Sequence, residues 1–277
     1  MSHKAERNPL QTVLLFIVAL GFGFGTLVQI ADQSQQHDQQ SLTIQYKSLK
    51  TADDIVQLSN PTRAIAYTSV VSLAKLPVAD KKQRFIALLL PAILISKQKH
   101  QQQRQKLDKI LATDHPTNLE QTWLNRQMAL YDVETPAQLK QRMINLPNSL
   151  ILAQAALETG WGSSRFFVKA NNVFGIWSFD PDEKRMMASQ QREGKKIYVK
   201  RYDSLLGAID DYFLTLGRGS AYKELRQAAR KTQNSQQLIR HLHRYSELGE
   251  DYIQRLDSLI RHNNLKQYDS YHLQNKA

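Results

Sequence analysis

The sequence predicts an α+β protein that is mostly α-helical and has a small β-hairpin lobe, on three observations. Apolar residues recur at helical spacing in long stretches such as 81–111. A strongly apolar helix is predicted at 150–157, and a Gly-Trp-Gly stop follows it at 160–162. Polar and apolar residues alternate at 196–199 after turn signals, which is typical of one arm of a hairpin.

The composition limits the classes of function. The chain has 277 residues, enough for one or two domains with a sizeable core, and a formal net charge of +12. A basic chain suits a polyanionic partner or a membrane surface. We do not expect nucleic acid as the partner, because the sequence has no cysteine for zinc fingers, no aromatic RNA-binding signature and no glycine-rich phosphate loop.

The N-terminus predicts a membrane anchor. Residues 10–31 contain no charge, which matches the ~20 residues that a helix needs to cross a bilayer. Lys4 and Arg7 precede this span and predict a cytoplasmic N-terminus, with the rest of the chain across the membrane. A cleaved signal peptide is the alternative. A polar, glutamine-rich linker is expected at 32–51.

Several helices are expected after this linker. Two of them, at 81–94 and 97–111, are expected to pack beneath the remaining chain, and Pro91 is expected to kink or end the first. Further helices at 205–216 and 221–230 have apolar faces that suit a scaffold behind a cleft.

Glu158 is the candidate catalytic residue, because the apolar helix delivers it directly to the Gly-Trp-Gly turn. The negative end of the helix dipole, the ring of Trp161 and the alanine-rich helix face disfavour the ionised form, so the pKa of Glu158 is predicted to be raised. A carboxylic acid that stays protonated near neutral pH suits a glycosidase, which must protonate a leaving glycosidic oxygen. The alternative is an exposed glutamate that only fills the helix end.

A longer motif surrounds this glutamate. It consists of Glu158-Thr159-Gly160-Trp161-Gly162, Ser164-Arg165-Phe166 and Asn171-Asn172-Val173-Phe174-Gly175-Ile176. These residues resemble the signature of the bacterial glucosaminidase family, glycoside hydrolase family 73. The resemblance extends to the Bax-type members over residues 60–265, with further motifs in the same order at 81–91, 202–204, 221–226, 245–252 and 260–265.

This resemblance implies an endo-β-N-acetylglucosaminidase with a lysozyme-like catalytic domain. The implied reaction is hydrolysis of the β-1,4 bond after N-acetylglucosamine in peptidoglycan, with Glu158 as general acid, peptidoglycan glycan strands as the partner and no cofactor. The expected domains are a helical N-terminal portion at 52–145, a glucosaminidase domain at 146–266 and a tail at 267–277. The expected location is the bacterial cell envelope, with the inner membrane as anchor and the catalytic domain in the periplasm.

The sequence leaves two alternatives for the second catalytic group. Relatives often carry a glutamate on the hairpin, and the equivalent position here is Tyr198. Glu193 is the nearest substitute and Glu183 the next, although both also suit solvated turn positions. The alternative is a substrate-assisted route, in which the 2-acetamido group of the sugar is the internal nucleophile.

Other residues are expected in the cleft. The resemblance aligns Tyr252 with a tyrosine near the catalytic glutamate, where its hydroxyl would orient Glu158 or the acetamido group. Gln154 lies one helical turn before Glu158 and is expected to hydrogen-bond it, unless its amide pairs with the backbone. The expected substrate-binding residues are Gln154, Trp161, Asn171, Asn172, Phe174, Trp177 and Tyr198. The alternatives are asparagines that only form the turn and aromatic rings, Phe174 above all, that belong to the core.

Two rival functions use the same residues. A lytic transglycosylase of the same fold would also use a single glutamate, but it would make an anhydro ring without water. A catalytically silent wall-binding or scaffold protein is the other rival, since the hairpin glutamate is missing. No metal site is expected, because His241 and His243 lie at i and i+2 and therefore on different helix faces.

Overall fold

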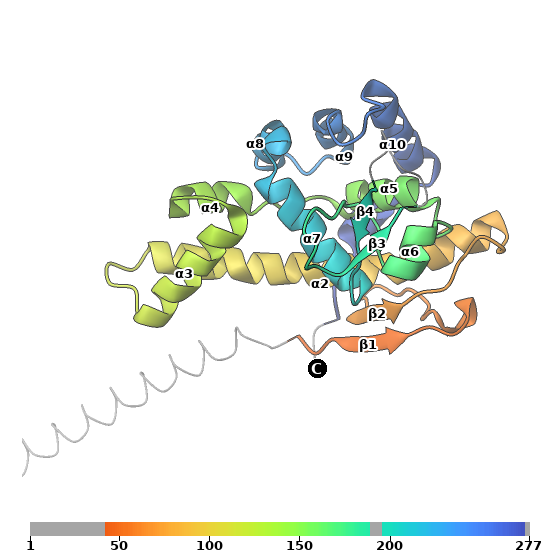
Figure 1. Cartoon of the computed structure of the whole chain (residues 1–277), viewed down its shortest axis with the longest axis horizontal. Coiled ribbons are helices and arrows are strands. Elements are labelled where there is room, and N and C mark those ends of the chain that lie inside the picture. The colour runs from red at the N-terminus through yellow and green to blue at the C-terminus, as the bar shows by residue number, and fades with distance from the viewer. Residues whose placement is uncertain (1–41, 189–195, 275–277) are drawn as a thin grey trace, which may run out of the picture. The chain divides into compact units, whose positions relative to one another are not determined.

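Helix α2 (Val78–Leu111) is the longest element, and several later helices lie along it (Figure 1). The computed structural model describes residues 42–188 and 196–274, and Ile44–Asn275 form one compact unit. The other α-helices are α3 (Asn118–Tyr131), α4 (Pro136–Arg142), α5 (Asn148–Thr159), α6 (Arg165–Ala170), α7 (Leu205–Arg218), α8 (Lys223–Ala229), α9 (Ser235–Leu238) and α10 (Glu250–His262). Short 3-10 helices are η1 (Ala52–Asp54), η2 (Ser220–Tyr222), η3 (Ile239–Leu242) and η4 (Leu265–Ser270).

Pro91 does not end helix α2. The sequence predicts two helices, at 81–94 and 97–111, but the structure has one helix of 34 residues. Proline removes a helical hydrogen bond, yet here it lies in a buried stretch at 85–96 within a helix that contacts α5 and α7. Burial of this stretch outweighs the lost bond, so the helix continues.

Helix α5 lies at the centre of the unit and positions the site. It contains the predicted apolar segment 150–157, which confirms that helix, and ten of its twelve residues are buried. It contacts α2 on one side and α10 and η4 on others. The residues on both sides of the predicted domain boundary at 145/146 therefore belong to one packed unit.

Two small sheets accompany the helices. The predicted hairpin is present, because β3 (Arg185–Met187) pairs antiparallel with β4 (Tyr198–Lys200), and Val199 is its buried residue. A parallel pair, β1 (Gln45–Ser48) with β2 (Ile65–Ser69), was not predicted. Strand β1 lies inside the segment expected to be a linker, 32–51, and all its residues are exposed. Strand β1 is held by backbone hydrogen bonds to β2, which require no apolar pattern, so this strand leaves no signal in the sequence.

The expected tail, 267–277, is also structured as far as residue 274. It begins inside η4, where the Asp269 carboxylate accepts hydrogen bonds from the backbone N–H (2.7 Å) and the hydroxyl (2.8 Å) of Ser149 at the start of α5. Leu273 forms a bridge with Thr62. A carboxylate at a helix N-terminus satisfies unpaired N–H groups, so this segment holds the first turn of the site helix.

Among the described residues, no helix combines the length and apolar character needed to cross a bilayer. The predicted membrane anchor, 10–31, lies outside the described residues.

Candidate active site

Glu158 lies in the last turn of α5, and the turn that follows it is unusual. Gly160, Trp161 and Gly162 all have positive φ angles, of 57°, 58° and 80°. The Thr159 hydroxyl donates to the Ala155 carbonyl (2.6 Å) and accepts from the Gly162 N–H (3.1 Å). Two of the three positions are glycine because a side chain is disfavoured in the left-handed region. The turn therefore fixes where the helix ends and where the carboxylate is placed.

We expect Gly162→Ala to lower the free energy of unfolding by roughly 2–3 kcal/mol, because overpacking adds to backbone strain. A Cβ at Gly162 would lie 3.0 Å from Leu73 Cδ1 and 3.2 Å from Phe85. Gly160→Ala is the matched control, since Gly160 is left-handed (φ 57°, ψ 44°) but the new Cβ would meet only Ser163 Cβ, at 3.9 Å; strain alone predicts a loss of about 1 kcal/mol. Urea unfolding measures both, and equal losses would contradict a tightly packed turn.

A chain of buried hydrogen bonds supports the carboxylate. The Tyr252 hydroxyl donates to Glu158 Oε1 (2.9 Å), and Gln154 Nε2 donates to the Tyr252 hydroxyl (3.0 Å). The Tyr212 hydroxyl donates to Gln154 Oε1 (2.5 Å). Gln154, Tyr252 and Tyr212 are almost completely buried. From the sequence, Gln154 was expected to hydrogen-bond Glu158 directly or to pair with the backbone. In the structure Gln154 instead contacts Glu158 through the Tyr252 hydroxyl, because α10 and α7 bring Tyr252 and Tyr212 to its amide.

Burial raises the pKa of Glu158, and the hydrogen bond from Tyr252 lowers it by a smaller amount. The predicted direction is confirmed, and the main cause is the loss of water around the carboxylate. Trp161, expected beside the carboxylate, packs edge-on against Phe85, with ring centroids 5.6 Å apart. Its ring also lies under the Lys82 ammonium, 5.2 Å from the centroid.

A groove of about 470 Å³ opens beside Glu158. It is lined by Phe174, Gly175, Ile176, Trp177, Phe179, Lys200, Asp211, Leu214, Thr215, Arg218, Gly219, Tyr222 and Tyr245. Glu158 is not itself a lining residue, but a Cβ at Gly175 would lie 3.7 Å from Glu158 Oε2, so this oxygen is close to a residue of the lining. Tyr245 stacks on Tyr252 at 5.7 Å and donates its hydroxyl to the Phe174 carbonyl (3.0 Å), which connects the groove to the hydrogen-bond chain.

The aromatic residues of the groove differ in exposure. Phe174 is 3% exposed and stacks on Tyr212 at 4.0 Å, which agrees with the core alternative. Trp177 is 42% and Phe179 is 83% exposed, and their ring centroids lie 6.2 Å apart. Sequence reasoning missed Phe179. Its position two residues after Trp177, in a segment with strand-like alternation, was the available signal.

The two asparagines use their amides on the backbone. Asn171 Nδ2 donates to the carbonyls of Thr68 (2.9 Å) and Tyr202 (3.0 Å). Asn172 Nδ2 donates to those of Ile176 (3.0 Å) and Lys200 (2.9 Å), and its Oδ1 accepts from the Ile176 N–H (3.1 Å). The contacts of Asn172 with Ile176 favour the turn-forming alternative, whereas Asn171 joins segments that are distant in sequence.

Two carboxylates, one of them in the groove lining, pair with Lys200 of β4. Lys200 Nζ lies 3.5 Å from Glu183 and 3.1 Å from Asp211, and the Tyr202 hydroxyl donates to Asp211 (2.6 Å). Sequence reasoning missed Asp211, which lies on α7, distant in sequence from the motif. Glu193 lies outside the described residues. Tyr198 lies under the Arg185 guanidinium, which is 4.2 Å from its ring centroid.

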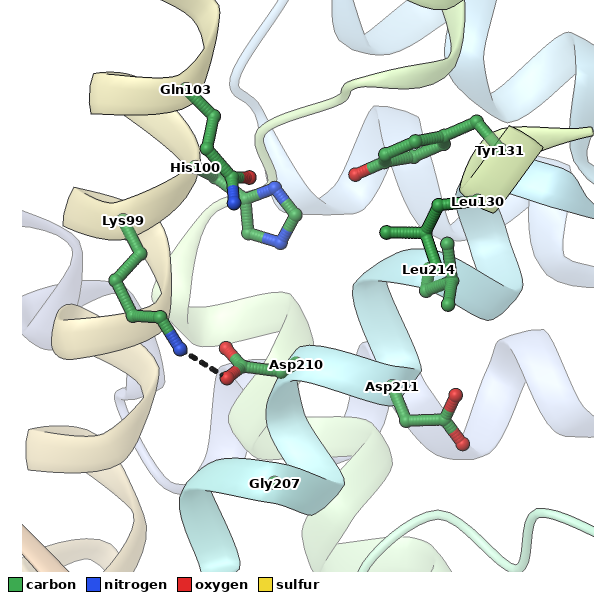
Figure 2. Close-up of a pocket in the computed structure, with 9 residues that line it drawn as sticks. All are labelled: Lys99, His100, Gln103, Leu130, Tyr131, Gly207, Asp210, Asp211 and Leu214. Carbon is green, nitrogen blue, oxygen red and sulfur yellow. Dashed lines mark hydrogen bonds and ion pairs between the residues drawn. The ribbon is translucent and has the colours of Figure 1, made fainter. Parts of the chain in front are cut away.

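A second cavity, of about 300 Å³, lies between α2, α3 and α7 (Figure 2). Two carboxylates line it, Asp210 and Asp211. Asp210 pairs with Lys99 (2.5 Å) and accepts from the Ser96 hydroxyl (2.6 Å). Burial lowers the pKa of His100 to about 4, so its ring is neutral at neutral pH. Asp210 is held by an ammonium and a hydroxyl, whereas no cation pairs with Glu158 among the described residues and burial raises its pKa.

Comparisons with known proteins match the part of the chain that contains Glu158. Residues 134–265 match the Glucosaminidase family, described as mannosyl-glycoprotein endo-beta-N-acetylglucosaminidase. The chain is 32% identical over 148 residues to the peptidoglycan hydrolase FlgJ of Escherichia coli (strain K12), covering 49% of this chain and 47% of that protein. It is 25% identical over 104 residues to the exo-glucosaminidase LytG of Bacillus subtilis, covering 36% of this chain and 37% of LytG. The chain thus spans about half the length of FlgJ and a smaller share of LytG.

Among solved structures, the catalytic domain of the autolysin Auto from Listeria monocytogenes matches with a TM-score of 0.39 and 25% identity. That match covers 61% of this chain and 97% of Auto's domain. Glu158, its hydrogen-bonded partners and every residue that lines the groove lie within 134–265, the part of the chain that matches the glucosaminidase family.

Proposed function

We propose that this protein is a peptidoglycan hydrolase, an endo-β-N-acetylglucosaminidase with a lysozyme-like catalytic domain, and that Glu158 is its general acid. One observation carries the proposal: Glu158 has a pKa raised by burial and adjoins a groove, inside the region that matches the glucosaminidase family. The description of FlgJ as a peptidoglycan hydrolase and of LytG as an exo-glucosaminidase supports the same substrate class.

The two oxygens of Glu158 have different surroundings, which suggests how the proton is transferred. Oε1 accepts the hydroxyl of Tyr252, whereas Oε2 lies beside Gly175 at the groove. The proton is therefore held on Oε2 and passes to the glycosidic oxygen of a bound glycan. The hydroxyl of Tyr252 then stabilises the carboxylate that remains, while Gln154 and Tyr212 hold that hydroxyl in place.

The water that completes hydrolysis is activated by Glu193 or replaced in the first step by the acetamido group of the substrate. Glu183 and Asp211 are less suited, because both already pair with Lys200. Proton NMR of the first-formed anomer distinguishes the routes. Inversion would exclude the substrate-assisted route, and retention would exclude direct attack by a water that Glu193 activates.

Digestion of purified cell-wall sacculi by the full chain, followed by mass spectrometry of the products, tests the reaction. The expected products carry N-acetylglucosamine at their reducing ends. Anhydromuramic ends would instead identify a lytic transglycosylase. Sedimentation of the protein with sacculi without any released sugar would identify a silent wall-binding protein.

The proposed location is the cell envelope, with residues 10–31 as an inner-membrane anchor for a Bax-type periplasmic enzyme. The absence of charge at 10–31 and the basic residues before it support this topology. Fractionation of cells with an alkaline wash, combined with protease treatment of spheroplasts, measures it. Release of the protein by the alkaline wash would contradict an anchor.

A further inference from the structure

We propose that the groove recognises a negatively charged glycan, and that the guanidinium of Arg218 pairs with a carboxylate of the peptide attached to the wall polymer. This inference rests on the proposed function and specifies its substrate. Under this proposal, Arg218 makes the enzyme prefer wall glycan that carries peptides over an uncharged glycan built from the same sugar.

Helix α7 forms one wall of the groove and places Arg218 on it. Asp211, Leu214, Thr215 and Arg218 line the groove at positions i, i+3, i+4 and i+7, so they share one face of the helix. Arg218 is exposed in the last turn. Its carbonyl accepts from Arg142 (2.6 Å), but its guanidinium has no ion pair among residues 42–188 and 196–274.

The charges of the groove leave a single uncompensated cation among its lining residues. The other cation, Lys200, lies between the carboxylates of Glu183 (3.5 Å) and Asp211 (3.1 Å), so its charge is neutralised locally. Arg218 lines the same groove without such a partner. Arg218 is therefore the lining cation, among the described residues, whose charged group can pair with an anionic ligand.

Another part of the lining has a different chemistry. Trp177 and Phe179 present exposed aromatic surface, which suits the apolar faces of sugar rings. A neutral glycan would need no guanidinium beside this surface. A wall glycan carries peptides with free carboxylates, and a guanidinium binds a carboxylate through two parallel hydrogen bonds. The combination of aromatic surface and one free guanidinium therefore fits a glycan that carries a carboxylate.

The test varies both partners of the proposed ion pair. Native sacculi are compared with sacculi whose carboxylates have been converted to amides, and the initial rate of sugar release is measured for the wild type, Arg218→Gln and Arg218→Lys. Arg240→Gln is the matched control, because this substitution removes the same charge from an exposed residue that does not line the groove. Thermal unfolding verifies that all variants are folded.

We expect Arg218→Gln to lower the rate on native sacculi about tenfold, Arg218→Lys to lower it less, and Arg240→Gln to leave it unchanged. Amidation should slow the wild type by a similar factor but should not slow Arg218→Gln further. Equal rates of Arg218→Gln and the wild type on native sacculi, or a separate further loss on amidated sacculi, would overturn this inference. Absence of sugar release by the wild type from both preparations would instead overturn the proposed function.

Discussion

Glu158→Gln is expected to reduce the release of sugar from sacculi about 1000-fold, the scale of effect of a positioned general acid. Glutamine retains the size of the side chain and an oxygen that accepts from Tyr252, but it cannot transfer a proton. The groove should therefore still bind glycan while bond cleavage fails. The measurement is the initial rate of reducing-end formation, together with sedimentation of the variant with sacculi.

Glu224→Gln is the matched control for this substitution. Glu224 is on α8, its side chain is 70% exposed, and it does not line the groove. It should retain the wild-type rate. A Glu158→Gln protein that is folded and keeps more than about a tenth of the wild-type rate would contradict the role of Glu158 as the acid.

Tyr252→Phe is expected to lower kcat about 100-fold, because a buried carboxylate loses a hydrogen bond in the state that follows proton transfer. The pH dependence should also change. The Tyr252 hydroxyl favours the ionised form and so lowers the pKa of Glu158. Without it, the pKa of Glu158 rises further. Since the protonated form is active, the limb on which activity falls with rising pH should move to higher pH.

Tyr67→Phe is the matched control for the loss of a buried hydroxyl. The Tyr67 hydroxyl accepts from the Val56 N–H (3.0 Å), and Tyr67 is not among the residues that line the groove. Tyr67→Phe should lower the free energy of unfolding but leave the pH profile of the activity unchanged. An unaltered profile in Tyr252→Phe would mean that this hydroxyl does not act on the acid during the reaction.

Local signals made the site helix predictable. Pro147 lies at the start of α5, and Gly160 takes a left-handed conformation directly after its end. Both effects act within one helical turn, so they can be read from neighbouring residues. The hairpin is similar, since its turn signals and alternation are local.

Other elements could not be predicted, because distant segments determine them. Strand β1 exists through its pairing with β2, about twenty residues later. Helix α2 continues through Pro91 because a buried stretch surrounds this residue in the tertiary structure. The pairing leaves no signal at the residues of β1, and the apolar sequence of 85–96 indicates burial without showing that the helix continues past Pro91.

The sequence by itself determined that a carboxylate ends an apolar helix before a glycine turn, and that this motif resembles a glucosaminidase. Only the tertiary structure decided what surrounds this carboxylate. Gln154 meets Tyr252 across 98 positions of sequence and Tyr212 across 58. Asp211 and Arg218 line the groove only because α7 packs beside it. The physical reason is that burial and hydrogen bonding depend on distance in space, and chain segments far apart come together only when the core forms.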